Sequence, residues 1–286
     1  MTIKSAPKTS VNPSLRKLLQ QLLIRAIALE SARSARKVHQ ARQEMKRARA
    51  VLRLMRGEIG TRAYRSANAA VRDAARPLSP VRDAKVLLDT LDSICRGDLQ
   101  LRESYLALHA GFKAAQRQAG RQLTRQSVRQ SGASMAQAGR RLQGVPLRMP
   151  DARSARLGVK RIYRSGRKAM DGAAKGADDK LHEWRKQAKY LSTQAAIAGD
   201  LFGAKLKKIR RRAHKLSSLL GEDHDLAQLN AKLSDLGANA SAGREALVLR
   251  IGHRRRELQR RARKLGKRLY RRSAKHFAAK LSRKIG

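Results

Sequence analysis

The fold is decided at residues 38–56, which read VHQARQEMKRARAVLRLMR. An apolar stripe runs through this stretch at alternating intervals of three and four residues, a spacing that places side chains on one face of an α-helix. The stripe comprises Val38, Ala41, Met45, Ala48, Leu52 and Met55. The stretch is therefore predicted to form a helix that packs against a core.

A second, cationic stripe starts one residue later and keeps the same spacing. It comprises His39, Arg42, Lys46, Arg49, Arg53 and Arg56. Successive residues lie about 100° apart around a helix, so this stripe flanks the core face instead of lying opposite to it. A basic helix face is most often simply solvated. A cationic stripe beside a core is better explained by a bound anion.

The same arrangement returns in the second part of the chain. Leu181, Trp184, Ala188, Leu191, Ala195 and Ala198 form its apolar stripe, and His182, Arg185 and Lys189 form its cationic one, with Lys186 on a neighbouring face. His39 precedes Asp83 by 44 residues, and His182 precedes Asp225 by 43. We predict two homologous helical halves, residues 1–143 and 151–286, joined by a linker at 144–150 and preceded by a disordered tail at 1–12.

The remaining sequence also predicts helices, which are interrupted at prolines and glycines. In the first half they are expected at about residues 14–30, 34–56, 61–76 and 81–95, with one or two more over 99–142, where Gly132 and Gly139 are weak points. In the second half one helix is expected over 204–220. Aromatic residues make up only 3% of the chain, which argues against a β-sandwich or barrel. The predicted fold class is all-α.

The chain carries 67 Lys and Arg residues against 21 Asp and Glu residues, a formal net charge of +46. Such a charge repels itself, and too few carboxylates are present to pair the cationic stripes, so a polyanionic partner is expected. Cations on other predicted helices should converge with the stripes on a groove or channel. These further candidates are Arg65, Arg72, Lys207, Lys208, Arg211, Arg212, His214, Arg250, Arg254 and Arg261.

Several classes of function are disfavoured. Cys95 is the single cysteine, which excludes an intramolecular disulfide and multi-cysteine zinc motifs and fits a cytoplasmic protein. No secretory signal or membrane-spanning segment is expected. The histidines form no His-x-x-x-His pair, and paired carboxylates, an activated nucleophile and a Gly-rich phosphate loop are all absent from the sequence. We expect neither a catalytic site nor a metal site.

The paired motifs resemble the CHAD family of conserved-histidine α-helical domains. The matching residues are His39-x-x-Arg42-x-x-x-Lys46-Arg47-x-Arg49 and His182-x-x-Arg185-Lys186-x-x-Lys189. A second signature, a turn before the fourth helix, matches residues 78–83 and 220–226. The resemblance covers the chain from about Val11 and implies two four-helix-bundle-like halves, related by pseudo-twofold symmetry around a basic groove or channel. It further implies inward-facing basic residues that bind inorganic polyphosphate.

The expected function is non-catalytic binding of polyphosphate by a stand-alone member of this family, in the cytoplasm at polyphosphate granules. His39 and His182 are expected to face phosphate; the alternative is that they are core histidines whose hydrogen bonds are satisfied within the protein. No cofactor is expected, although divalent cations can accompany bound polyphosphate; the oligomeric state is not predicted. The alternative is sequence-non-specific, nucleoid-type binding of nucleic acid, which would use the same cations for backbone phosphates. Aromatic residues for base stacking are scarce, so nucleic acid is expected to be the weaker polyanion.

Overall fold

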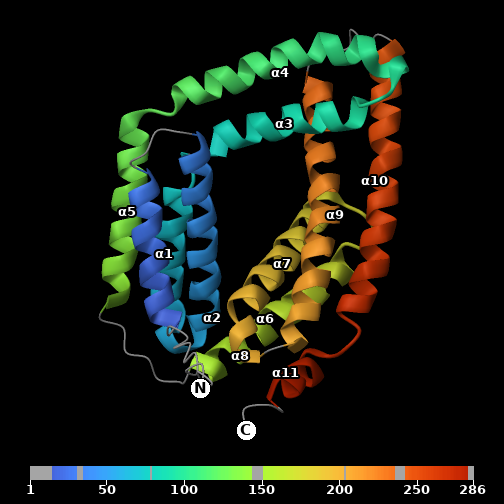
Figure 1. Ribbon diagram of the computed structural model, residues 1–286. Helices are drawn as coiled ribbons and strands as arrows, with labels where there is room; N and C mark the ends of the chain where they lie inside the picture. Colours follow the sequence, from blue (N-terminus) through green and yellow to red (C-terminus); the bar gives the residue numbers. More distant parts are fainter. Residues whose placement is uncertain are drawn as a thin grey trace, which may run out of the picture.

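The computed structural model describes residues 15–30, 35–77, 79–143, 151–202, 204–235 and 242–282. Throughout these ranges the regular structure is helical, with no strand, as predicted (Figure 1). The first part of the chain forms α1 (Leu15–Glu30), α2 (Ala35–Ala74), α3 (Ser79–Cys95), the short 3₁₀ helix η1 (Leu99–Leu101), α4 (Arg102–Gln122) and α5 (Arg125–Gln143).

The second part forms another six helices in the described ranges. They are α6 (Asp151–Gly172), α7 (Asp178–Ile197), α8 (Gly199–Phe202), α9 (Ala204–Asp235), α10 (Ala242–Leu269) and α11 (Ala274–Ser282). The predicted linker at 144–150 and the predicted tail lie outside the described residues. The division into two symmetry-related halves therefore stays a prediction.

α2 is a helical hairpin. Gly60 has φ 78° and ψ 161°, a left-handed region that glycine enters without a Cβ clash. Arg49 Nε donates to Asn68 Oδ1 at 3.1 Å, and Arg42 donates to the Ala75 carbonyl at 3.1 Å. Each pair joins a residue before the bend to one at a similar distance after it, so the two arms of α2 run antiparallel. The break that the sequence predicts near Gly60 is confirmed.

Pro77 and Pro80 flank the turn between α2 and α3, and the chain changes direction there. α3 packs against α4, and both helices reach across the molecule to the second part of the chain. α3 contacts α9, and α4 contacts α10 (Figure 1). At the other side α2 packs on α6 and α7. The helices thus form a closed ring around a central opening.

The core lies where the predicted apolar stripes meet. The Met45 side chain is 1% exposed, and the Trp184 side chain is completely buried. Gly158 of α6 lies directly against α2: a Cβ on this residue would lie 2.7 Å from Leu54 Cα. The absence of a side chain at Gly158 therefore allows the backbones of the two helices to approach closely.

The stretch 99–142 forms two long helices, α4 and α5, as one of the expected outcomes had it, but neither predicted weak point divides them. Gly132 and Gly139 both lie inside α5, and the chain instead breaks between α4 and α5, where the Thr124 hydroxyl accepts a bond from the Ser127 amide at 3.1 Å. This bond caps the start of α5. The turn expected at 220–226 is also absent, because α9 continues through Gly221 to Asp235.

No helix in the described ranges is long and apolar enough to cross a membrane.

Candidate functional site

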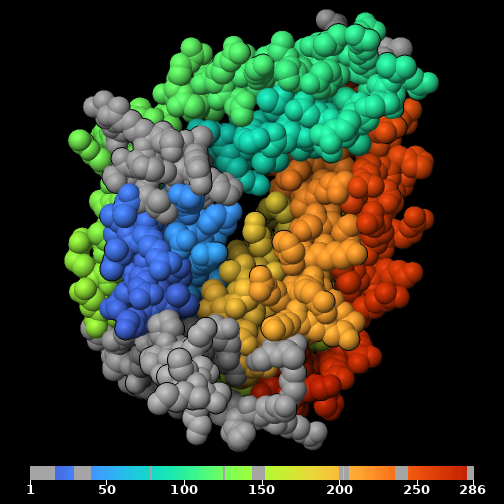
Figure 2. Space-filling view, viewed as in Figure 1, coloured from blue at the N-terminus to red at the C-terminus, as the bar shows by residue number. Residues whose placement is uncertain are grey.

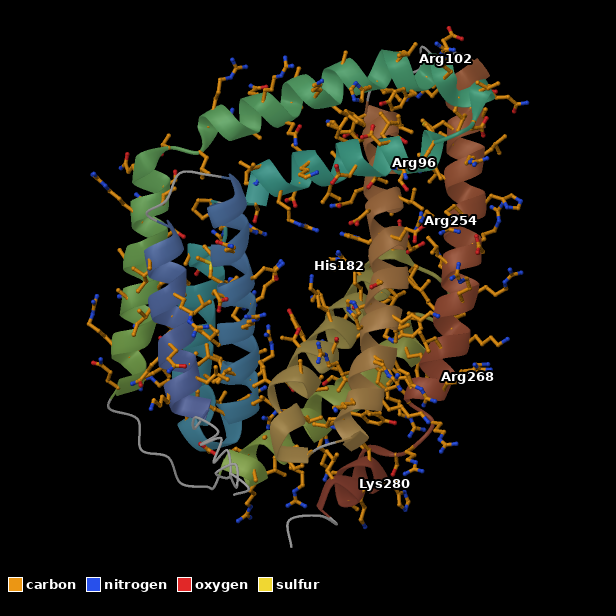
Figure 3. The ribbon with its side chains drawn as sticks, in the orientation of Figure 1. Arg96, Arg102, His182, Arg254, Arg268 and Lys280 are labelled. Atoms are coloured by element: carbon orange, nitrogen blue, oxygen red, sulfur yellow. The ribbon has the colours of Figure 1, made fainter. Side chains whose placement is uncertain are left out.

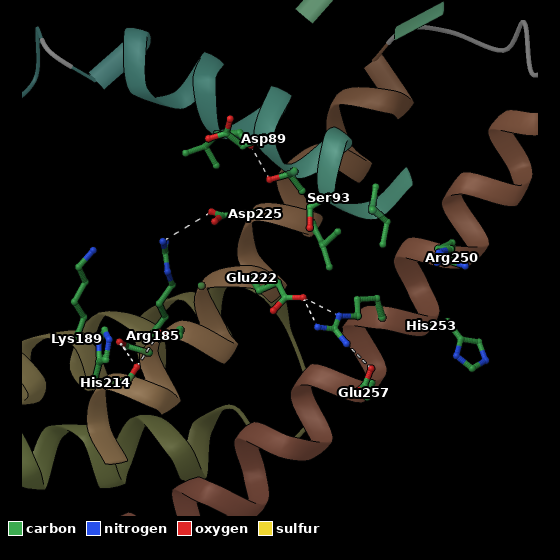
Figure 4. A pocket seen from close by; sticks show the side chains of 18 of the residues that line it. Asp89, Ser93, Arg185, Lys189, His214, Glu222, Asp225, Arg250, His253 and Glu257 are labelled. Carbon is green, nitrogen blue, oxygen red and sulfur yellow. Dashed lines mark hydrogen bonds and ion pairs between the residues drawn. The ribbon is translucent and has the colours of Figure 1, made fainter. Parts of the chain in front are cut away.

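A cavity of about 1090 Å³ opens at the centre of the ring. The space-filling view shows the hollow between α2, α3 and the α7–α9 pair (Figure 2). The described lining of the 1090 Å³ cavity comes from α3, α7, α9 and α10 and includes no residue of α2, so the cavity lies on the α7–α9 side of this hollow (Figure 4). Of the predicted site residues, it is lined by Arg185, Lys189, His214, Arg250 and Arg254.

Five cationic side chains meet beside this cavity, and they define the central cation cluster: Arg42 and Lys46 of α2, Arg82 of α3, and Arg185 and Lys189 of α7. Burial and the positive charge of the other four side chains lower the pKa of Lys46 to about 8. The cluster therefore joins cations from both predicted halves, as the sequence analysis expected of a groove.

Burial and positive neighbours also act on the other cations of the cluster. Burial is the largest cause of the lowered pKa of Arg42, and the charge of Arg82 adds to it. Burial, followed by the charge of Arg185, lowers the pKa of Lys189. The Lys189 side chain is nevertheless solvent-exposed, because it lines the open cavity while protein surrounds it on other sides. An anion entering the opening would relieve this repulsion.

Two carboxylates partly balance the cluster. The Arg185 guanidinium lies 3.8 Å from Asp225 Oδ1, the contact drawn in Figure 4. Arg82 pairs with Asp83 at 3.1 Å. Burial raises the pKa of Asp225 in spite of the cations around it. In the described part of the chain no carboxylate lies within ion-pair distance of Lys46, so the α2 side of the cluster keeps a net positive charge.

His182 makes a contact that the sequence analysis did not predict. Its Nδ1 lies 3.4 Å from the Nδ1 of His224 on α9, a hydrogen bond whose direction depends on the tautomers. Burial, followed by the charge of Lys186 and Arg185, lowers the pKa of His182. Burial, followed by Arg185, lowers the pKa of His224 to about 4. Both rings are therefore neutral at pH 7 (Figure 3 places His182 beside the central opening).

Arg49 and Arg53 continue along α2 but leave the opening. The Arg53 guanidinium lies over the Tyr190 ring of α7, 3.7 Å from its centroid, and it donates to the Arg49 carbonyl at 3.1 Å. Arg49 bonds Asn68 in the other arm of the hairpin. These two predicted site residues thus lie in the α2–α7 contact and the hairpin, where their first role is structural.

The α10 cations are paired, contrary to the expectation of too few carboxylates. Arg250 lies 2.8 Å from Asp98, Arg254 lies 2.6 Å from Glu222 and 2.7 Å from Glu257, and Arg261 lies 3.1 Å from Glu257. The sequence has few acids, but the fold concentrates them on this wall. The cavity lining itself holds Asp89, Glu222, Asp225 and Glu257 against four Lys and Arg residues.

The other predicted site residues lie away from the cluster. Arg65 and Arg72 are exposed on the second arm of α2, where Arg72 pairs with Asp73 at 3.0 Å. Lys186 pairs with Glu183 at 2.5 Å. Lys207, Lys208, Arg211 and Arg212 of α9 are absent from the central lining. His39 belongs to α2, but its side chain lies outside the described residues.

Sequence reasoning left Arg82, His224 and Asp225 out of the site. Arg82 lies in the stretch 78–83, and His224 and Asp225 lie in the stretch 220–226, and both stretches were interpreted as turns before a helix. Within the described ranges no cluster of three or more His, Cys, Asp or Glu side chains is arranged to hold a metal ion.

Comparison with known proteins gives a family match. The CHAD domain profile matches residues 14–234. No curated protein matches the chain. The CHAD domain from the plant Ricinus communis shares 19% identity at a TM-score of 0.54, over 94% of this chain and 89% of that one. PptA from Streptomyces chartreusis shares 11% identity at a TM-score of 0.64, over 91% of this chain and all of that one. At these identities the two structures support the fold.

Proposed function

The chain belongs to the CHAD domain family, and on that premise we propose that it binds inorganic polyphosphate, without catalysis, at the central cation cluster. The observation that carries the proposal is the mutual repulsion of five cations that three helices hold beside an open cavity. Arranging like charges in this way costs stability, and a bound polyanion offsets that cost.

The side chains divide the binding between them. Arg42, Arg82 and Arg185 present planar guanidinium groups that can donate two bonds to phosphate oxygens. Lys46 and Lys189 supply mobile point charges that follow a flexible chain. The cations of α10 are already paired with carboxylates, so the polyphosphate chain is expected to run along the α2–α7 side of the opening, where the cations are less balanced.

Nucleic acid is the second candidate, because backbone phosphates would meet the same cations. The described lining of the central cavity favours polyphosphate, which is a thinner polymer than nucleic acid. Its lining holds no Trp, Tyr or Phe side chain on which a base would stack. Polyphosphate carries charge at every unit and has no base to accommodate.

The test is a competition at physiological salt between long-chain polyphosphate, duplex DNA and single-stranded RNA. We expect polyphosphate to displace both nucleic acids. A central variant, Arg42→Gln/Lys46→Gln/Arg185→Gln/Lys189→Gln, should bind polyphosphate at least about tenfold more weakly, a loss of about 1.4 kcal/mol or more.

The matched control removes four exposed cations from α4 and α5: Arg117→Gln/Arg121→Gln/Arg129→Gln/Arg140→Gln. The two variants have the same net charge, so a larger loss in the central variant reports the site and not the total charge. Tighter binding of duplex DNA than of polyphosphate by the wild type would replace the proposal with the nucleic-acid alternative. We further propose that polyphosphate binding places the protein at cytoplasmic polyphosphate granules.

A further inference from the structure

A second cavity lies at the base of the molecule, between α9, the end of α10 and α11. It holds about 650 Å³. Its cationic lining residues are Lys208, Arg212, Arg268, Arg271, Arg272 and Lys280. Figure 3 shows Arg268 and Lys280 at this base, well away from His182 and the central opening. We call this space the basal cavity.

The basal cavity is more one-sided in charge than the central one. Its described lining holds six Lys and Arg residues and no carboxylate, whereas the central lining balances four with four. Lys208, Arg212, Arg268, Arg271 and Arg272 form no ion pair with any described carboxylate. The acids that pair the middle of α10 end at Glu257, three turns before Arg268.

Packed side chains and hydrogen bonds form the floor of the basal cavity. Tyr163 of α6 donates to the Leu269 and Arg272 carbonyls, both at 3.1 Å, and its ring stacks on Phe277 at 4.1 Å between centroids. Phe277 and Leu281 are 5% and 3% exposed. Arg212 donates to the Arg268 carbonyl at 3.4 Å. The cations therefore project from a rigid apolar floor.

The two cavities lie on opposite faces of α9. Arg212 lines the basal cavity, and His214 lines the central one. Two residues on a helix differ by about 200° around its axis. An anion held against the central face of α9 therefore does not contact Arg212 on the other face, and the basal cations form a separate group.

We propose that the basal cavity is a separate binding site for a short, multiply charged oligophosphate, which is either a free molecule or the end of a longer chain. Guanidinium groups from α10, the following turn and α9 surround the space and can hold several phosphate oxygens at once. The apolar floor excludes water from one side of the site, which strengthens these bonds.

The experiment measures binding of inorganic tripolyphosphate by calorimetry. A basal variant, Lys208→Gln/Arg212→Gln/Arg268→Gln/Arg271→Gln, is compared with the wild type, with the central variant and with the α4–α5 control variant. We expect the basal variant to lose one binding event, with affinity reduced at least about tenfold, while the central and control variants keep that event. Thermal unfolding checks that each variant is folded.

A milder variant, Lys208→Glu/Arg271→Glu, changes only exposed side chains and should show the same loss. Equal losses in the basal and control variants would show a net-charge effect and overturn the proposal. Loss of every tripolyphosphate binding event in the central variant would overturn it too, because only the central site would then exist. If the central variant keeps all of its polyphosphate affinity, the central proposal fails while the basal one stands.

Long-chain polyphosphate separates the two sources of the ligand. A basal variant that also binds long chains more weakly shows that the cavity holds part of such a chain. Unchanged long-chain affinity, together with lost tripolyphosphate binding, shows that a free short oligophosphate is the ligand.

Discussion

Lys46 is the cation of the central cluster whose pKa is lowered into the slightly alkaline range. Its pKa of about 8 means that a fraction of this lysine is neutral in the free protein at slightly alkaline pH. The causes are burial and four cations on three helices, namely Lys189, Arg42, Arg82 and Arg185 in that order. A bound polyanion reverses the sign of this field and raises the pKa of Lys46 again.

This reversal predicts the pH dependence of binding. Below about pH 8 Lys46 is protonated in both the free and the bound protein, so affinity is at its full value. Above that pH binding must take up a proton, so affinity for long-chain polyphosphate should fall as pH rises from about 7.5 to 9.5, by at most about tenfold per pH unit for one group. Fluorescence or calorimetric titrations at several pH values measure the fall.

Replacing Lys46 by arginine tests whether deprotonation of Lys46 causes the fall in affinity. Lys46→Arg keeps its charge throughout the range, so the fall in affinity should become shallower. Lys113→Arg, on the exposed face of α4, is the matched control and should behave as the wild type. Identical pH profiles for all three proteins would mean that Lys46 does not meet the ligand.

The histidines show which side-chain contacts could not be predicted from the sequence. Their position at the head of each cationic stripe was visible, and for His182 it led to the prediction of a phosphate-facing group. The Nδ1 contact with His224 depends on how α7 packs against α9, more than 40 residues along the chain. His182 is already bonded in the free protein, so a phosphate contact through Nδ1 would require this pair to separate.

Among the elements, α2 and α6 are in close backbone contact at Gly158 and Leu54. Gly158→Ala would place a Cβ 2.7 Å from Leu54 Cα and 2.9 Å from the Leu54 carbonyl oxygen. Backbone atoms cannot move aside as a flexible side chain can. We expect the variant to lose about 1–3 kcal/mol in free energy of unfolding, the usual cost of overpacking a core.

Chemical denaturation measures this loss, and Gly111→Ala in α4 is the matched control. A Cβ at Gly111 meets nothing within 4 Å, so alanine should there stabilise the helix by about 0.5–1 kcal/mol. If Gly158→Ala were as stable as Gly111→Ala, α2 and α6 would not be in close backbone contact.

The helices themselves were largely predictable, because apolar spacing reports local structure. The bend at Gly60 was predictable for the same reason. Gly221 misled because glycine is tolerated inside a helix that tertiary contacts hold, and α9 continues through this position to Asp235. Asp223, which belongs to the expected turn at 220–226, is instead buried in the middle of α9 and accepts bonds from Arg255 and Gln259.

The sequence identified many of the cations near the site. It did not show which of them face the central cavity, which face the basal cavity and which are paired with acids. The spacing placed Arg42 and Lys46 beside the core, and they do meet Arg185 and Lys189. The α9 cations followed the same rule, yet Arg212 and His214 face different cavities. Pairing of the α10 cations depends on acids that are distant in sequence, such as Glu222 for Arg254.

At the scale of the whole molecule the net charge of +46 is the dominant quantity. Local ion pairs neutralise parts of α10, but the central cation cluster and the basal cavity remain positive. Salt therefore acts on the free protein and on the complex in opposite directions. Screening reduces self-repulsion in the free protein, while it weakens the contacts that hold a polyanion, whose binding releases counterions.

The final prediction follows from these two opposite effects of salt on stability and on binding. Raising potassium chloride from about 50 to 300 mM, across which screening becomes strong, should raise the melting temperature of the free protein. The same change should lower the melting temperature at a fixed, near-saturating concentration of long-chain polyphosphate, because ligand-linked stability falls with affinity. Differential scanning fluorimetry follows both series. A melting temperature of the free protein that falls with salt would mean that ion pairs such as Arg254–Glu222 outweigh the repulsion. Repulsion among the central cations would then be too weak for its relief to drive the binding of a polyanion.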